Sequence, residues 1–120
     1  MFEIAVKGHI ASAHFLRGYE GKCKDFHGHT WKIEVVIASD QLDEIGMVAD
    51  FALLKKQLKE FLTVIDHVCL NDLEYFKEAN PTTENIAKYI YTHFDKVIDP
   101  LTIKTVQVWE SDTSSVTYYE

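Results

Sequence analysis

The hydrophobic period of this chain changes twice along its length, and this change most restricts the fold. Residues 2–13 and 29–39 alternate apolar with polar side chains, as strands with one buried face do. The middle of the chain repeats apolar residues every three or four positions, which is the period of an amphipathic helix. Residues 102–110 and 115–119 alternate again. The sequence therefore predicts two strands, two helices and two further strands.

Two segments carry the helical pattern. Asp50 is placed to cap a helix that runs to about Ile65, and the side opposite its apolar stripe is rich in lysine, as a solvated face is. A second helix begins at Pro81-Thr82-Thr83-Glu84, with a threonine cap and an acidic first turn, and Pro100 stops it. The predicted apolar stripes consist of Phe51, Leu54, Leu58, Phe61, Leu62 and Ile65 in the first helix, and of Ile86, Ile90, Phe94 and Val97 in the second.

The order β-β-α-α-β-β indicates an α+β fold, in which a four-stranded antiparallel sheet carries both helices on one face. The chain has 120 residues and no internal repeat or linker, so we expect one domain spanning residues 1–120. A domain of this size has no spare layer. We therefore expect another subunit to cover the open face of the sheet.

Composition restricts the partners and the compartment. A formal net charge of −7 argues against general nucleic-acid binding, which relies on clustered lysine and arginine. No apolar run approaches the ~20 residues needed to cross a bilayer, and the first residues lack the pattern of a signal peptide. The two cysteines, Cys23 and Cys69, form neither a zinc pair nor a disulfide framework. We expect a cytoplasmic protein that binds neither nucleic acid nor membranes.

Three histidines, His14, His27 and His29, are the strongest chemical signal. Three imidazole nitrogens with one coordination position left open are typical of a catalytic zinc site. On a regular strand His27 and His29 share one face, which His14 can reach from a neighbouring strand. That face is also the apolar face of the strand. Either the metal lies against a buried surface, or a bulge near Gly28 changes the phase of the strand.

Cys23 lies four residues before His27, in a glycine-bearing loop over residues 18–26. A thiolate is a strong nucleophile or base once a nearby metal or cation lowers its pKa. Because its neighbours are charged, we predict that Cys23 is functional. Cys69 stands between two apolar residues, and we interpret it as a buried structural cysteine.

Asp66-His67 and Glu110 are further candidates. Asp66 can orient and charge His67 as a general acid or base, although the alternative is a histidine that ends the first helix and interacts with its dipole. Glu110 ends the third strand and can accept paired N–H donors from a guanidine-like ligand edge, or it is merely solvated. His9 and His93 show no ligand spacing, so we expect them to be structural.

Taken together, these segments resemble the 6-pyruvoyl-tetrahydropterin synthase family. The gap of three residues between Cys23 and His27 is similar to the queuosine-pathway branch, the 6-carboxytetrahydropterin synthases, whereas the tetrahydrobiopterin branch typically has a longer gap. Ile65 stands where the family usually has leucine, which changes the volume little. The matching segments, in family order, are Ser12-Ala13-His14, Cys23-x-x-x-His27-Gly28-His29, Gly46-Met47-Val48-Ala49-Asp50-Phe51, Asp66-His67 with Leu70-Asn71, Pro81-Thr82-Thr83-Glu84-Asn85, and Glu110.

The resemblance implies the tunnelling fold, trimers closed into a twelve-stranded barrel and stacked as hexamers, and active sites between subunits. It implies 7,8-dihydroneopterin triphosphate as the substrate. The queuosine branch would make 6-carboxy-5,6,7,8-tetrahydropterin, acetaldehyde and triphosphate, and the alternative branch would make the 6-pyruvoyl product from the same substrate. A non-catalytic zinc-binding module on this fold is a third possibility, against which the presence of Cys23, Asp66 and His67 argues.

The resemblance also implies catalytic roles. Zn²⁺ would act as a Lewis acid on the substrate side chain. Cys23 would abstract a proton on one side of the substrate, and Asp66 with His67 would form a proton relay on the other. The implied zinc ligands are His14, His27 and His29.

For the substrate, the resemblance implies that Glu110 anchors the 2-amino-pyrimidinone edge of the pterin, helped by Thr82 and Glu84. The triphosphate contacts are the weakest part of the match. Arg17 is the one arginine of the chain, and Lys22 and Lys24 are candidates. A negative chain that binds a polyanion must concentrate its basic groups, which suggests contributions from two subunits.

Overall fold

The computed structural model describes residues 1–21 and 25–120, so the predictions for Lys22, Cys23 and Lys24 lie outside the described residues. The predicted order of strands and helices is confirmed, with a short additional helix, α2, before the second long one. The elements are β1 (Phe2–His14), β2 (His27–Ser39), α1 (Phe51–Leu62), α2 (Glu74–Glu78), α3 (Thr83–Val97), β3 (Thr102–Ser111) and β4 (Ser114–Tyr118), with short 3₁₀ turns η2 (Thr63–Ile65) and η3 (Leu70–Asp72).

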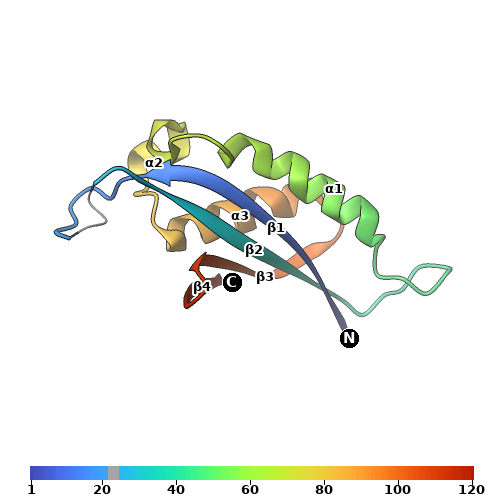
Figure 1. Ribbon diagram of the computed structural model, residues 1–120. Helices are drawn as coiled ribbons and strands as arrows, with labels where there is room; N and C mark the ends of the chain where they lie inside the picture. Colours follow the sequence, from blue (N-terminus) through green and yellow to red (C-terminus); the bar gives the residue numbers. More distant parts are fainter. Residues whose placement is uncertain (22–24) are drawn as a thin grey trace.

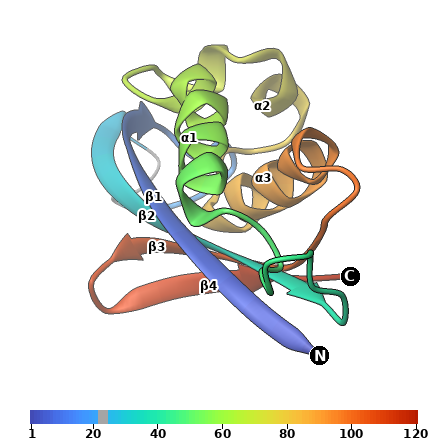
Figure 2. The same ribbon diagram turned by 90° about the vertical axis from the view of Figure 1, so that its right-hand side faces the viewer.

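The strands form one antiparallel sheet in the order β1-β2-β3-β4, which makes β1 and β4 the edge strands. All three helices lie on the same face of this sheet (Figures 1 and 2). Asp50 caps α1 by accepting a hydrogen bond from the main-chain N–H of Ala52, and Thr82 caps α3 by accepting one from Asn85. No helix in the described part of the chain is long and apolar enough to span a membrane.

The core lies between the sheet and the helices. It is formed by the alternating apolar residues of the strands and the apolar stripes of the helices. The predicted stripes are wrong at their ends: Phe51 is 51% exposed and Val97 is 46% exposed. Phe51 is the first residue of α1 and Val97 the last of α3, so each stripe is exposed at one end. Ile98, only 4% exposed, fills the position after α3 instead.

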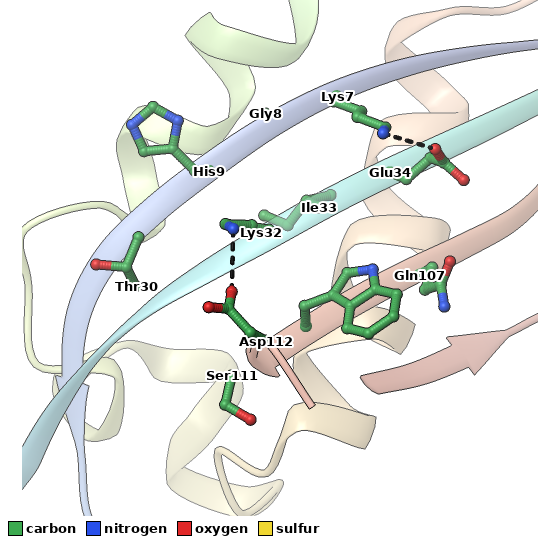
Figure 3. A pocket seen from close by; sticks show the side chains of 11 residues that line it. Lys7, Gly8, His9, Thr30, Lys32, Ile33, Glu34, Gln107, Ser111 and Asp112 are labelled. Carbon is green, nitrogen blue, oxygen red and sulfur yellow. Dashed lines mark hydrogen bonds and ion pairs between the residues drawn. The ribbon is translucent and has the colours of Figure 1, made fainter. Parts of the chain in front are cut away.

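The opposite face of the sheet, hereafter the outer face, carries charged and polar side chains together with Trp109. It carries a shallow hollow of about 590 Å³ whose rim includes His9, Thr30 and Gln107. Two ion pairs cross it, Lys7–Glu34 at 3.7 Å and Lys32–Asp112 at 3.1 Å, as Figure 3 shows. Because these charged side chains lie on the face, hydrophobic burial does not by itself require a subunit packed on it.

The contact between α1 and β1 gives a test of the core. A Cβ atom added to Gly8 would lie 3.3 Å from Leu58 Cδ2, so α1 approaches the sheet where β1 has no side chain. Leu58→Ala should lower the free energy of unfolding by about 2–5 kcal/mol, because the cavity beside Gly8 cannot close. Lys56→Ala, on the exposed side of α1, should change it by less than about 0.5 kcal/mol. Urea unfolding at matched protein concentration measures both, and equal effects would contradict the packing.

Candidate metal and active site

The pairing of β1 with β2 brings the three histidines together. The ladder runs without a register shift from Phe2 opposite Ser39 to His14 opposite His27, and Ser12 stands opposite His29. The alternative of a bulge near Gly28 is therefore wrong, and the rings lie on the helix-facing side of the sheet. Their ligand atoms all lie within 4.8 Å of one another, and the group could hold a metal ion. The predicted convergence of these residues is confirmed.

Two main-chain carbonyls fix the orientation of His14 and His27. The Nδ1 of His14 is 2.6 Å from the Pro81 carbonyl oxygen, and the Nδ1 of His27 is 2.5 Å from that of Asp25. Because a carbonyl only accepts, each Nδ1 carries the proton, and in the neutral rings each Nε2 presents a lone pair. Metal-binding histidines usually donate their second nitrogen in this way.

The two Nε2 atoms, of His14 and His27, are 2.9 Å apart. Two lone pairs at this distance repel each other unless a proton or a metal cation lies between them. Nitrogen ligands of a tetrahedral zinc are about 3.3 Å apart when each bond is 2.0–2.1 Å. A small adjustment of the rings would therefore bring both atoms into coordination distance of one cation.

His29 supplies the third nitrogen. Its Nε2 is buried and has no hydrogen-bond partner among the described residues, which is costly for a polar atom. Burial lowers the pKa of His29 and also that of His14, which is only 1% exposed. Both rings are therefore neutral near pH 7, as metal ligands must be. Among the described residues, these three nitrogens form a group that could hold a divalent metal ion.

Asp66 and His67 form a hydrogen-bonded pair beside β1. Asp66 Oδ2 is 2.9 Å from His67 Nδ1, and Asp66 Oδ1 accepts a hydrogen bond from the Ala11 N–H at 2.8 Å. The hydrogen bond from Ala11, and then the one from His67, lower the pKa of the Asp66 carboxyl. The pair follows η2 rather than α1, so the alternative of a histidine on the dipole of that helix is wrong.

The conformation of His67 is unusual. Its φ is 56°, in the left-handed region that a non-glycine residue occupies only when its surroundings impose it. Its N–H donates to the Ala11 carbonyl at 2.7 Å, which holds this conformation. With Nδ1 directed at Asp66, the Nε2 of the neutral ring is free to accept a proton, and the side chain is 82% exposed. The arrangement suits a proton relay that works on a molecule outside the core.

Ser12 and Cys69 are close to this pair. The Ser12 hydroxyl donates to the Ile65 carbonyl at 2.6 Å and accepts from the Val68 N–H at 3.3 Å. It therefore bonds the main chain directly before Asp66 and directly after His67. Cys69 is half-buried and lines a hollow of about 580 Å³ together with His29 and His67. The prediction of a buried Cys69 is wrong, because its segment lies along the edge of β1, where it bridges to Ala13.

Glu110, at the end of β3, is oriented by a residue that sequence reasoning missed. Thr83 is buried, and its hydroxyl donates to Glu110 Oε2 at 2.8 Å, while the Trp31 indole N–H approaches the same hydroxyl at 3.4 Å. Thr82, which the sequence singled out, caps α3. Glu84 lines a small hollow of about 190 Å³ with Thr83 and Glu110.

The remaining candidates lie elsewhere. Arg17 donates its Nη2 to the Phe76 carbonyl at 2.8 Å, a contact with the main chain. His9 is exposed on the outer face, and His93 bonds the Tyr89 carbonyl from within α3, so neither joins the cluster, as predicted. Among the residues that the structure describes, the buried polar side chains are Ser12, His14, Asn71 and Thr83.

Comparison with known proteins agrees with this geometry. The family model for 6-pyruvoyl tetrahydropterin synthase matches residues 3–120. The chain is 38% identical to the 6-carboxy-5,6,7,8-tetrahydropterin synthase of Bacillus subtilis, covering 93% of this chain and 80% of that protein. It is 36% identical to human 6-pyruvoyl tetrahydrobiopterin synthase, covering 82% and 70%.

A solved structure, that of Caenorhabditis elegans 6-pyruvoyl tetrahydropterin synthase, superposes with a TM-score of 0.88. The two chains are 27% identical, and the match covers 99% of this chain and 95% of that one. The fold is therefore the tunnelling fold of these enzymes, as the sequence predicted. The chain belongs to the 6-pyruvoyl tetrahydropterin synthase family.

Proposed function

We propose that this pterin synthase converts 7,8-dihydroneopterin triphosphate to 6-carboxy-5,6,7,8-tetrahydropterin, acetaldehyde and triphosphate, with Zn²⁺, in queuosine biosynthesis. The observation that carries the proposal is the convergence of three histidine nitrogens within 4.8 Å of one another. Relatives named 6-carboxy-5,6,7,8-tetrahydropterin synthase, at 38% and 37% identity over most of the chain, support the choice of product.

Zinc would be held by His14, His27 and His29. When bound, it would supply Lewis acidity to the hydroxyl groups of the substrate side chain. Zinc is favoured because a site of three protein nitrogens and one open position is the usual form of its catalytic sites. The carbonyls of Pro81 and Asp25 would keep two of the rings in the tautomer that binds metal.

Glu110 would anchor the pterin ring. Its carboxylate can accept two N–H donors from the guanidine-like edge of the pterin, in the geometry that carboxylates form with arginine. The hydrogen bond from Thr83 already fixes the orientation of this carboxylate, so little freedom is lost when the ring binds. Glu84 borders the same hollow, and Thr82 keeps the start of α3 in place.

His67 would accept and return a proton at Nε2. Asp66 holds the opposite ring nitrogen and stabilises the imidazolium that forms, because its own pKa is low and it stays charged. Cys23 would abstract a proton from the other side of the substrate. A cation close to a cysteine lowers its pKa and favours the thiolate that this role needs.

We further propose a homohexamer, with sites shared between subunits. The sheet ends on one side in β4 and on the other in β1, whose outer edge is paired within the chain from Ala11 onward. Copies can join through β4 and the earlier part of β1 into a closed barrel. The ion pairs on the outer face suit the water-filled interior of such a barrel better than a dry interface. Asp66 and His67 lie along the β1 edge, where a neighbouring copy would meet them.

The second candidate is 6-pyruvoyl-tetrahydropterin synthase activity on the same substrate. The 36% identity to the human enzyme of that name favours it, whereas the short gap between Cys23 and His27 favours the carboxy product. The mass of the product distinguishes them. Incubation of the zinc-loaded protein with dihydroneopterin triphosphate should yield acetaldehyde and a carboxypterin. A product that keeps all side-chain carbons would establish the alternative, and no turnover would refute both.

Removal of one ligand tests the metal site. His27→Ala should weaken zinc binding by more than about 100-fold, since even a lost outer-shell partner costs 10–100-fold. His9→Ala is the matched control, because His9 is an exposed histidine on the outer face, and its variant should bind zinc normally. Chelator competition followed by elemental analysis measures both. Full zinc occupancy in His27→Ala would remove this residue from the site.

The pH dependence of zinc binding provides a further readout of the same site. Protons compete with the metal for imidazole, and burial lowers the pKa of His14 and His29. Zinc affinity should therefore stay nearly constant above about pH 6.5, the ordinary pKa of histidine, and fall only below it.

Mixed oligomers test the shared site. Cys23→Ala and His67→Ala should each be inactive yet retain zinc, because neither removes a proposed ligand. If the two residues act from different subunits, co-expression of the variants should restore about a quarter of the sites, those that combine two intact contributions. Cys23→Ala combined with the double variant Cys23→Ala/His67→Ala is the negative control. No recovery in the mixed oligomer would place both residues of a site in one subunit.

A further inference from the structure

The edge of β1 that faces away from β2 is followed by a series of hydrogen bonds that continues past the end of the strand. The Ala11 N–H donates to the Asp66 carboxylate, and the Ala11 carbonyl accepts from the His67 N–H. The Ala13 N–H donates to the Val68 carbonyl at 2.9 Å. The next two positions on this edge, residues 15 and 17, lie beyond the strand. Their partners are side chains.

Asn71 pairs with Phe15, and Asn80 pairs with Arg17. The Phe15 N–H donates to Asn71 Oδ1 at 3.0 Å, and Asn71 Nδ2 donates to the Phe15 carbonyl at 3.0 Å. The Arg17 N–H donates to Asn80 Oδ1 at 3.0 Å, and Asn80 Nδ2 donates to the Arg17 carbonyl at 3.1 Å. A carboxamide offers a donor and an acceptor in one plane, as a peptide group does. Each asparagine therefore takes the place of a residue in a neighbouring strand.

The two asparagines, Asn71 and Asn80, with their hydrogen bonds to Phe15 and Arg17, are hereafter called the asparagine clamp. The clamp is linked to the histidine cluster. Phe15 directly follows His14, and Asn80 directly precedes Pro81, whose carbonyl accepts the hydrogen bond from His14 Nδ1. The Asn80 carbonyl is itself held by the Thr82 N–H at 2.7 Å and by Asn85 Nδ2 at 2.8 Å. The ring of His14 and the main chain at Arg17 are thus fixed to the same turn before α3, while Asn71, in η3, holds the main chain at Phe15 between them.

We propose that Asn71 and Asn80 are positioning residues for His14: they hold the main chain from His14 to Arg17 so that Nε2 of His14 faces the metal position. This inference rests on the metal site of the proposed function. Without the clamp, the main-chain N–H and carbonyl groups of Phe15 and Arg17 lose these partners. The His14 ring can then leave the orientation in which it bonds the Pro81 carbonyl. Metal affinity should then fall although every ligand remains.

Four variants of the full-length protein test this. Asn71→Ala and Asn80→Ala should each lower zinc affinity by about 10–100-fold, the usual cost of losing an outer-shell partner. Amide hydrogen exchange in the metal-free protein should become faster at Phe15 in the first variant and at Arg17 in the second. Asn71→Asp keeps the acceptor for the Phe15 N–H but loses the donor, so its exchange at Phe15 should lie between those of wild type and Asn71→Ala. Asn80→Asp should behave in the same way at Arg17.

Two controls separate positioning from general destabilisation. Ile103→Val trims the core in β3, away from the cluster, and should lower stability while leaving zinc affinity unchanged. Gln107→Ala removes an amide on the outer face and should change neither quantity.

The outcomes are distinct. Unchanged zinc affinity in both alanine variants, or a loss in Ile103→Val as large as theirs, would overturn the positioning role. Unchanged exchange at Phe15 and Arg17 would overturn the clamp itself, whether or not the protein binds metal. Failure of the wild type to act on dihydroneopterin triphosphate would refute the proposed reaction, while the zinc titrations and exchange rates would still decide this inference.

Discussion

The main-chain ladder between β1 and β2 is the interaction on which the rest of the structure depends. It places His14 opposite His27 and Ser12 opposite His29 at one end of the sheet. Because side chains alternate between the two faces, a slip of one residue would send His14 to the outer face and separate it from the other rings. The apolar residues farther along both strands resist this slip, since their burial against the helices requires the same register. The core therefore specifies the geometry of the site.

Polar groups are buried where they hold this site. Ser12 bonds the main chain just before Asp66-His67, and Asn71 bonds the main chain just after His14. Thr83 bonds the Glu110 carboxylate. The buried Nε2 of His29 has no partner among the residues that the structure describes, which costs about 1–3 kcal/mol until a cation binds. The metal-free cluster is therefore locally destabilising. A bound metal would give the His29 nitrogen a partner and would remove the repulsion between the lone pairs of His14 and His27.

Much of this could be predicted from sequence, for identifiable reasons. Strand and helix periods report burial directly, so the element order was predictable, and the spacing of His27 and His29 placed both on one face. The exposure of Phe51 and Val97 was not predictable, because a periodic pattern does not show how far along a helix the buried stripe extends. Thr83 was missed in favour of Thr82, since both fit a cap and only the tertiary structure brings one of them to Glu110.

The asparagine clamp carries no sequence pattern, because its partners lie 56 and 63 residues apart. The central claim concerns the atoms around the metal, and zinc K-edge X-ray absorption on the purified protein tests it most directly. Three imidazole nitrogens and one oxygen are expected at about 2.0–2.1 Å from the zinc. A sulfur ligand at about 2.3 Å, or fewer than three imidazoles, would contradict it.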